Sequence, residues 1–148
     1  MSTPGPREFR IMRDHHGSSG FTVDDALAER FHDEIEVVQV DCTTLDHELA
    51  GRGLSIDVLK IDAEGAEPEV LAGATRLLQE QRSMQIVMEY TAANRPAVDI
   101  LVEHGYRISV LGEDGSLTPV EPDRLGDSAP LDMLFCYRGL AGALGKAA

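Results

Sequence analysis

Apolar and polar positions follow one another along the chain in a way that predicts alternating strands and helices. The stretch Ser55–Asp62 is rich in β-branched residues and nearly all apolar, apart from Asp57 and Lys60. Such continuous apolar runs are typical of strands covered on both faces, as in a parallel sheet. A helix beginning near Pro68 is predicted next, because apolar residues recur at helical spacing at Val70, Leu71, Ala74, Leu77 and Leu78.

The same alternation continues toward the end of the chain. We expect a strand at Met84–Tyr90, a helix at Asn94–Gly105 and a strand at Tyr106–Gly115. A long loop rich in Gly, Pro and Asp, Glu113–Pro130, then leads into a last strand at Leu131–Gly139. Strands that alternate with helices predict an α/β layer built on a mainly parallel sheet.

The first third of the chain carries weaker patterns. We expect a strand at Glu8–Met12, a helix at Thr22–His32 with Thr22 as its N-cap, a strand at Glu34–Cys42 and a short helix within Thr43–Gly53. For the whole chain we expect a disordered N-terminus at residues 1–8, a single domain at residues 9–138 and a flexible tail at residues 139–148.

Composition restricts the classes of function. The 148 residues suffice for one domain, and a net charge of −13 argues against binding to nucleic acid or to anionic membranes. No apolar run approaches the roughly 20 residues that span a bilayer, and the N-terminus lacks the apolar segment of a secretory signal. We therefore expect a cytoplasmic protein with a small-molecule partner, in which Cys42 and Cys136 are reduced thiols.

Negative charge is concentrated between the strand at Ser55–Asp62 and the helix after it. Asp62 ends the strand and Glu64 lies in the following turn, at the edge where α/β sheets bind ligands. Lys60 lies two residues before Asp62 and so faces the same side of the strand. A lysine buried there needs a partner, which Asp62, or Glu89 near the end of the next strand, can provide.

Two interpretations of the acids are open. Carboxylates before a helix accept hydrogen bonds from its free N–H groups, and this capping explains Glu67 and Glu69. Asp62 and Glu64 exceed what capping requires, so we take both as candidate site residues. Their spacing alone does not choose among metal binding, general-base catalysis and hydrogen bonding to a substrate.

A second polar group contains Asp14, His15 and His16. Adjacent side chains of an extended chain point apart, and no third ligand is evident. We therefore predict a surface loop here and no metal site in the chain.

The stretch DVLKIDAEGAEPEVLAGA, Asp57–Ala74, resembles the signature of the FkbM family of methyltransferases. That signature is an apolar strand, then K-x-D-x-E-G-x-E, then a helix containing V-L-x-G-A. The matching residues are Lys60, Asp62, Glu64, Gly65, Glu67, Val70, Leu71, Gly73 and Ala74. VVQVDCTTLD (Val37–Asp46) and IVMEY (Ile86–Tyr90) are similar to the family's flanking strands, so the resemblance extends over about residues 9–138.

This resemblance implies the C-terminal portion of a Rossmann-like class I methyltransferase fold, with a mainly parallel sheet, helices on both faces and an antiparallel last strand. It also implies S-adenosylmethionine as cofactor and O-methylation of a sugar or natural-product hydroxyl. Asp62 and Glu64 would then be catalytic. Other residues would bind the substrate or lie at the rim of the site, namely Lys60, Glu67, Glu89, His15 and His16.

Compared with that family, the first half of the fold is missing from this sequence. No strand leads into a glycine-rich turn and a helix, the arrangement that lets a backbone approach a cofactor closely. We therefore expect a domain without its cofactor-binding half, with an exposed sheet edge that invites pairing. The chain would then form homo-oligomers, pair with a polypeptide that supplies the missing half, or act as a non-catalytic α/β module. A metal-dependent hydrolase using Asp62 and Glu64 is a third reading.

Overall fold

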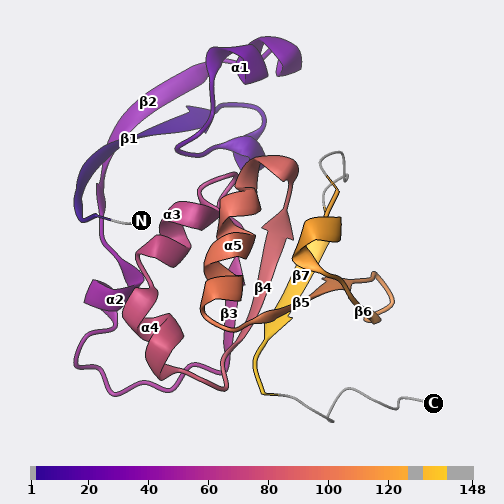
Figure 1. Ribbon diagram of the computed structural model, residues 1–148. Coiled ribbons are helices and arrows are strands. Elements are labelled where there is room, and N and C mark those ends of the chain that lie inside the picture. Colours follow the sequence, from indigo (N-terminus) through magenta and orange to yellow (C-terminus); the bar gives the residue numbers. More distant parts are fainter. Residues whose placement is uncertain (1–2, 127–131, 140–148) are drawn as a thin grey trace.

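The computed structural model describes residues 3–126 and 132–139, which form a two-stranded and a five-stranded sheet with their helices (Figure 1). In the smaller sheet, β1 (Gly5–Met12) pairs antiparallel with β2 (Ile35–Cys42) along its whole length. β1 therefore includes residues 5–8, which we expected to be disordered. The expected tail lies outside the described residues apart from Gly139.

The larger sheet has the strand order β3-β4-β7-β5-β6. Its strands are β3 (Val58–Ile61), β4 (Gln85–Tyr90), β5 (Arg107–Leu111), β6 (Leu117–Pro119) and β7 (Asp132–Tyr137). Within the described residues, β3 and β4 form the one parallel pair, and the other three pairs are antiparallel. The prediction of a mainly parallel sheet is therefore wrong, whereas the antiparallel last strand is confirmed.

The position of β7 explains this difference. β4 and β5 both run antiparallel to β7, so β3, β4 and β5 all point in the same direction, as their helical connections require. Because β7 returns between β4 and β5, two antiparallel pairs stand where the alternation suggested a parallel one. The mixed sheet with a separate two-stranded sheet is not clearly Rossmann-like.

Three helices lie on one side of the larger sheet (Figure 1). They are α3 (Glu67–Ala72), α4 (Thr75–Glu80) and α5 (Arg95–Glu103). Their buried side chains meet the buried positions of β4 and β7 in one core, which includes Leu71, Leu78, Val98, Leu101, Ile86, Met88 and Leu134.

The opposite face of the larger sheet is less covered. Val58 on this face is 57% exposed, and on β4 the partly exposed Val87 and Glu89 alternate with the fully buried Ile86 and Met88. The prediction of helices on both faces is thus wrong for the described residues. Strand β3 thus carries one apolar residue, Val58, at a position that faces solvent.

The helix expected from Pro68 to Leu78 is divided into α3 and α4. The division falls at Gly73, whose N–H donates to the carbonyls of Glu69 and Val70 and closes the first segment. Both segments still bury the predicted stripe, because Leu71 and Leu78 have no exposed surface. The unpredicted strand β6 lies within the expected long loop.

Two short helices flank β2. α1 (Asp25–Phe31) begins at Asp24, whose carboxylate accepts the Leu27 N–H at 2.8 Å, so the predicted Thr22 cap is wrong. α2 (Leu45–Glu48) begins at Thr44, whose hydroxyl accepts the His47 N–H at 3.0 Å. Three single-turn 3-10 helices complete the fold, η1 (His16–Ser18), η2 (Ala92–Asn94) and η3 (Pro122–Arg124). Within the described ranges, every helix is too short or too polar to cross a bilayer.

Candidate functional site

The candidate site is built on the turn between β3 and α3. β3 ends at the buried Ile61, and the chain then turns through two residues with left-handed backbone, Glu64 (φ 48°) and Gly65 (φ 90°). A Cβ on Gly65 would lie 3.0 Å from the Thr22 hydroxyl, so both the conformation and the space favour glycine. Glu64 also has a positive φ, which is uncommon for a residue other than glycine and is energetically unfavourable.

The buried side chain of Glu67 holds this turn together by hydrogen bonds. Its side chain is fully buried, and Oε1 accepts the N–H of Ala63 at 2.9 Å and of Gly65 at 3.4 Å. Oε2 accepts a hydrogen bond from the amide of Asn94 at 3.1 Å, which ties the turn to the segment after β4. The bonded N–H groups lie before the helix, and the N-cap is Ala66. The capping interpretation of Glu67 is therefore wrong, and its carboxylate instead shapes the turn.

The capping interpretation of Glu69 is replaced by an ion pair. The Glu69 carboxylate contacts the guanidinium of Arg7 on β1, and both side chains are a little over one-third exposed. This contact joins the smaller sheet to α3.

Three carboxylates converge at the C-terminal ends of β3 and β4, beside the turn. Asp62, Glu64 and Glu89 each place an oxygen within 4.8 Å of the others. Asp62 follows β3 and Glu89 is near the end of β4, so the C-terminal ends of the parallel pair bring them together. Lys60 Nζ donates to Asp62 Oδ2 at 2.7 Å, as predicted, although the Lys60 side chain is 62% exposed and not buried.

Burial and mutual repulsion change the acidity of these groups. Burial, and then the charges of Glu89, Asp62 and Glu67, raise the pKa of the Glu64 carboxyl. Burial and the charges of Asp62 and Glu67 likewise raise the pKa of Glu89, with Lys60 acting in the opposite direction. A carboxylate with a raised pKa accepts a proton more readily, so the group suits general-base chemistry.

The same three acids are oxygen donors of the kind that Mg²⁺ and Ca²⁺ prefer. They offer one ligand atom each, and within the described residues no histidine or cysteine joins them. Mg²⁺ usually keeps several waters and is held by one or two carboxylates, so three carboxylates are compatible with a cation but are equally compatible with a site without one. Metal binding therefore has no support beyond the acids themselves.

A cavity of about 220 Å³ opens beside the acids, between β1, the loop after η1 and the turn after β3. Asp62 and Glu64 contribute to its wall together with Phe9 and Phe21. A larger cavity of about 630 Å³, lined by Tyr106, Arg107 and other residues, shares no lining residue with it. Asp62 and Glu64 thus border the smaller cavity, whereas Glu89 is not among its lining residues.

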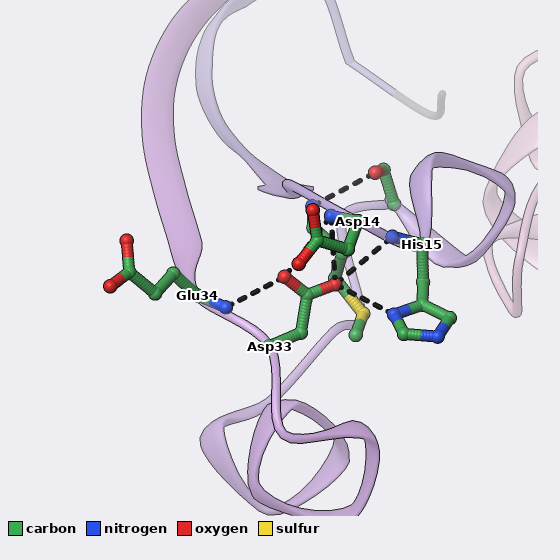
Figure 2. Close-up of polar contacts among 6 residues, drawn as sticks. Asp14, His15, Asp33 and Glu34 are labelled. Atoms are coloured by element: carbon green, nitrogen blue, oxygen red, sulfur yellow. Dashed lines mark hydrogen bonds and ion pairs between the residues drawn. The ribbon is translucent and has the colours of Figure 1, made fainter.

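The predicted His15 lies in a different polar cluster, around Asp33 (Figure 2). The side chain of Asp33 is 0% exposed and accepts the N–H groups of Asp14 at 3.1 Å, His15 at 3.0 Å and Glu34 at 2.7 Å. His15 Nδ1 lies 2.9 Å from Asp33 Oδ2. Burial raises the pKa of Asp33, but these hydrogen bonds outweigh burial and lower the pKa from 3.8 to about 2.

This cluster joins the loop after β1 to the loop before β2. The ring of His15 also packs on Phe31, with 4.8 Å between ring centroids, and His16 begins η1. Within the described residues, neither histidine has a hydrogen bond or ion pair to Asp62, Glu64 or Glu89. A role for His15 and His16 at the rim of the site therefore stays a prediction.

Sequence reasoning missed Asp33 and Asn94. Asn94 is 2% exposed and its amide donates to Glu67 and to the Glu89 carbonyl, so it connects two candidate site residues. Its place just before the helix-starting pair Arg95–Pro96 was the available signal, since asparagine there is typical of a cap. Asp33 carried no comparable signal, because its partners come from a loop 18 residues away.

The described residues do not form a glycine-rich cofactor turn. The parallel strands β3 and β4 are followed by turns in which several backbone donors are already used. The N–H groups of Ala63 and Gly65 bond to Glu67, and the Thr91 N–H bonds to the Asn94 side chain at 2.9 Å. Carboxylates crowd the first of these turns. These residues alone do not fit the cradle that S-adenosylmethionine needs.

Comparison with known proteins gives one match. A family model described as "Methyltransferase FkbM domain" matches residues 8–108, about two-thirds of the chain. No curated protein and no solved structure matches.

Proposed function

Because the chain belongs to the FkbM methyltransferase domain family, we propose that it takes part in methyl transfer from S-adenosylmethionine to a hydroxyl oxygen. Its acceptor would be a small molecule, such as a sugar or a natural product. The observation that carries this proposal is the convergence of Asp62, Glu64 and Glu89 within 4.8 Å at the ends of β3 and β4. Carboxylates so placed can bind an acceptor hydroxyl and take up its proton.

We assign the roles from charge and contact. Glu64 accepts the proton of the acceptor hydroxyl, because its raised pKa makes it a stronger base than an ordinary glutamate carboxylate. Asp62 accepts a hydrogen bond from the same hydroxyl and is kept in place by Lys60 at 2.7 Å. Glu89 and Glu67 add the negative charge that keeps the Glu64 pKa raised. Glu67 acts as a positioning residue, since it bonds to the turn and not to the cavity.

The cofactor requires groups beyond the described residues. Since neither available turn forms the cradle, we propose that another polypeptide segment, or a second copy of this chain, completes the cofactor pocket. The family implies both cofactor binding and methyl transfer to oxygen, and the experiment below tests the two together.

Calorimetric titration of the purified chain with S-adenosylmethionine comes first. Saturable binding near micromolar, followed by transfer of a labelled methyl group to a hydroxyl compound, supports the proposal. Glu64→Gln and Asp62→Asn should then lower kcat roughly 10²–10⁴-fold, the range of a lost general base, while the exposed control Glu103→Gln keeps the rate. Unchanged turnover in both variants contradicts it, as does a folded chain that binds no S-adenosylmethionine either alone or together with the polypeptide that completes the pocket.

The open edge of β3 favours a second candidate, a non-catalytic module that pairs with another chain. β3 is the first strand in the sheet order and pairs with β4 alone among the described residues. Val58 on this strand and Leu54 just before it are 57% and 55% exposed. Unpaired strand edges with apolar neighbours recruit further strands. A defined hetero-oligomer without methyl transfer supports this candidate, and a catalytically active monomer contradicts it.

A further inference from the structure

The cavity beside the acids has two kinds of wall. Its lining includes the acidic residues Asp62 and Glu64 and the aromatic residues Phe9 and Phe21. Val70, from α3, adds an aliphatic side chain. Phe9, Phe21 and Val70 are each only partly buried, so the cavity accounts for apolar surface that the core does not cover.

Several contacts hold these walls at a fixed separation. The Thr22 hydroxyl donates to the Glu64 carbonyl, which fastens the loop after η1 to the turn after β3. A Cβ on Gly20 would lie 3.2 Å from the Glu64 Cβ, so loop and turn are already in close contact. The Phe9 and Phe21 rings pack edge to face with centroids 5.0 Å apart. The cavity is therefore formed by packed elements from both sheets.

Size and charge together restrict what can enter. A dry cavity of about 150 Å³ accepts benzene, so about 220 Å³ accommodates one ring-sized group with a substituent. The aromatic wall favours an apolar body over a fully hydroxylated one. The carboxylates accept a hydrogen bond from a hydroxyl but repel an anion of the same sign of charge.

We propose that this cavity binds the reactive end of the acceptor, and that this end is an uncharged, ring-sized apolar group bearing a hydroxyl. Phe9, Phe21 and Val70 contact the apolar body, and Asp62 and Glu64 contact the hydroxyl. Phe21 and Val70 are thus specificity-determining residues. The inference rests on the proposed methyl-transfer function for the meaning of the hydroxyl, but binding to the cavity is testable without the cofactor.

Benzyl alcohol, benzoate and methyl α-glucoside are suitable probes, because the first two share a ring and the third replaces it with polar groups. Each is titrated into the ¹⁵N-labelled full chain, and amide shifts are followed by NMR. We expect benzyl alcohol to shift the amides of Phe21, Ala63 and Val70 saturably. Benzoate and methyl α-glucoside should bind at least 10-fold more weakly.

Variants then test the two walls separately. Val70→Phe fills the cavity and should weaken benzyl alcohol at least 10-fold, whereas the matched control Val102→Phe, on the exposed side of α5, should bind as the unmodified chain does. Phe21→Leu is a second test of the apolar wall if Val70→Phe does not fold. In the double variant Asp62→Asn/Glu64→Gln the difference between benzyl alcohol and benzoate should fall below 3-fold.

Four results would overturn the inference. They are equal binding of benzoate and benzyl alcohol, preferred binding of methyl α-glucoside, shifts that map outside the cavity, and Val70→Phe or Phe21→Leu without effect. If S-adenosylmethionine-dependent methyl transfer is nevertheless detected, the proposed function stands while this inference fails. If the probes bind as expected but no transfer occurs with any hydroxyl compound, the cavity is a binding site and the proposed function fails.

Discussion

At the scale of single residues, Glu67 shows how a buried carboxylate can organise a loop. It accepts three hydrogen bonds, from Ala63, Gly65 and Asn94, and has no exposed surface. Glu67→Gln keeps the shape but turns one acceptor into a donor that faces other donors. A buried donor left unsatisfied costs about 1–3 kcal/mol, so urea unfolding should show a loss of that size.

The matched control for this variant is Glu69→Gln, two residues along the same helix. Glu69 is partly exposed and its ion pair with Arg7 lies at the surface, where such pairs contribute little. We expect a clearly smaller loss in the control. Equal losses in the two variants would mean that burial of Glu67 has no special role in the turn.

Glu89 should destabilise the fold at neutral pH. Its pKa is raised by burial and by Asp62 and Glu67, so the folded state holds its proton more tightly than the unfolded state. Stability from this group is complete below the unfolded pKa near 4.5 and is lost as the pH rises through the higher folded pKa. Glu89→Gln removes the repelled charge and should raise the free energy of unfolding at pH 7.

Urea unfolding at two pH values checks this expectation. The gain from Glu89→Gln should be present at pH 7 and small at pH 4, where Glu89 itself is largely protonated. Glu113→Gln, an exposed substitution of the same type, should change little at either pH. A loss of stability from Glu89→Gln at pH 7 would contradict the raised pKa.

Asp33, unlike Glu89, should stabilise the fold at neutral pH. Its folded pKa of about 2 lies below the ordinary 3.8, so its contribution is complete above pH 4 and disappears as the pH falls from about 4 to about 2. Asp33→Asn should therefore be less stable than the unmodified chain at pH 7, with a difference that shrinks through that window. Thermal unfolding at pH 7, 4 and 2.5 measures it. The exposed control Asp57→Asn should show no such narrowing, and a constant difference for Asp33→Asn would refute the assignment.

At the scale of elements, β3 has two unlike edges. The Gln85 N–H donates to the Asp57 carbonyl at 2.8 Å, and the backbone groups of alternate residues in a parallel strand point to the same side. Leu59 and Ile61 therefore face β4, while Val58 and Lys60 face away from it. Amide hydrogen exchange by NMR should show protected N–H groups at Leu59 and Ile61 and fast exchange at Val58 and Lys60.

The exchange pattern also reports on pairing. If another strand covers this edge, the Val58 and Lys60 amides should become protected by a large factor when the partner is added. The amides of Leu59 and Ile61 serve as internal controls, because β4 protects them in either case. Protection of all four amides in an isolated monomer would show that the edge is not open.

Much of the element pattern could be predicted from the sequence because it depends on local spacing. The strand at Met84–Tyr90 and the helix at Asn94–Gly105 differ from β4 and α5 by at most two residues at either end. Strand neighbours could not be predicted in the same way. The insertion of β7 between β4 and β5 depends on contacts between residues up to 50 positions apart, such as Ile86 and Cys136, which leave no periodicity in the sequence.

The acidic group was predictable for a related reason. Asp62 and Glu64 end a recognisable strand, and Glu89 nearly ends the next one, so parallel β3 and β4 bring them to one edge. The buried roles of Glu67 and Asn94 could not be predicted, because burial is set by packing of α3 against α5. The aromatic wall at Phe9 and Phe21 also escaped prediction, since it depends on how the smaller sheet docks on the larger.

At the scale of the whole molecule, a net charge of −13 on 148 residues should weaken the folded state through self-repulsion. Salt screens exposed charges beyond about 10 Å at 0.1 M, so raising NaCl from 20 to 500 mM should stabilise the chain. A gain of about 1 kcal/mol would raise the Tm by roughly 3–5 °C for a domain of this size. Calorimetric scans at the two salt concentrations measure the shift.

A charge-reversed chain gives the control for this last prediction. Glu29, Glu36 and Glu113 are exposed and have no ion pair within the described residues, so their change to lysine should leave the packing intact. Three changes of two units each bring the net charge from −13 to −7. The salt-induced rise in Tm should then become clearly smaller. If salt instead lowers the Tm of the unmodified chain, surface ion pairs such as Arg13–Glu34 outweigh the repulsion.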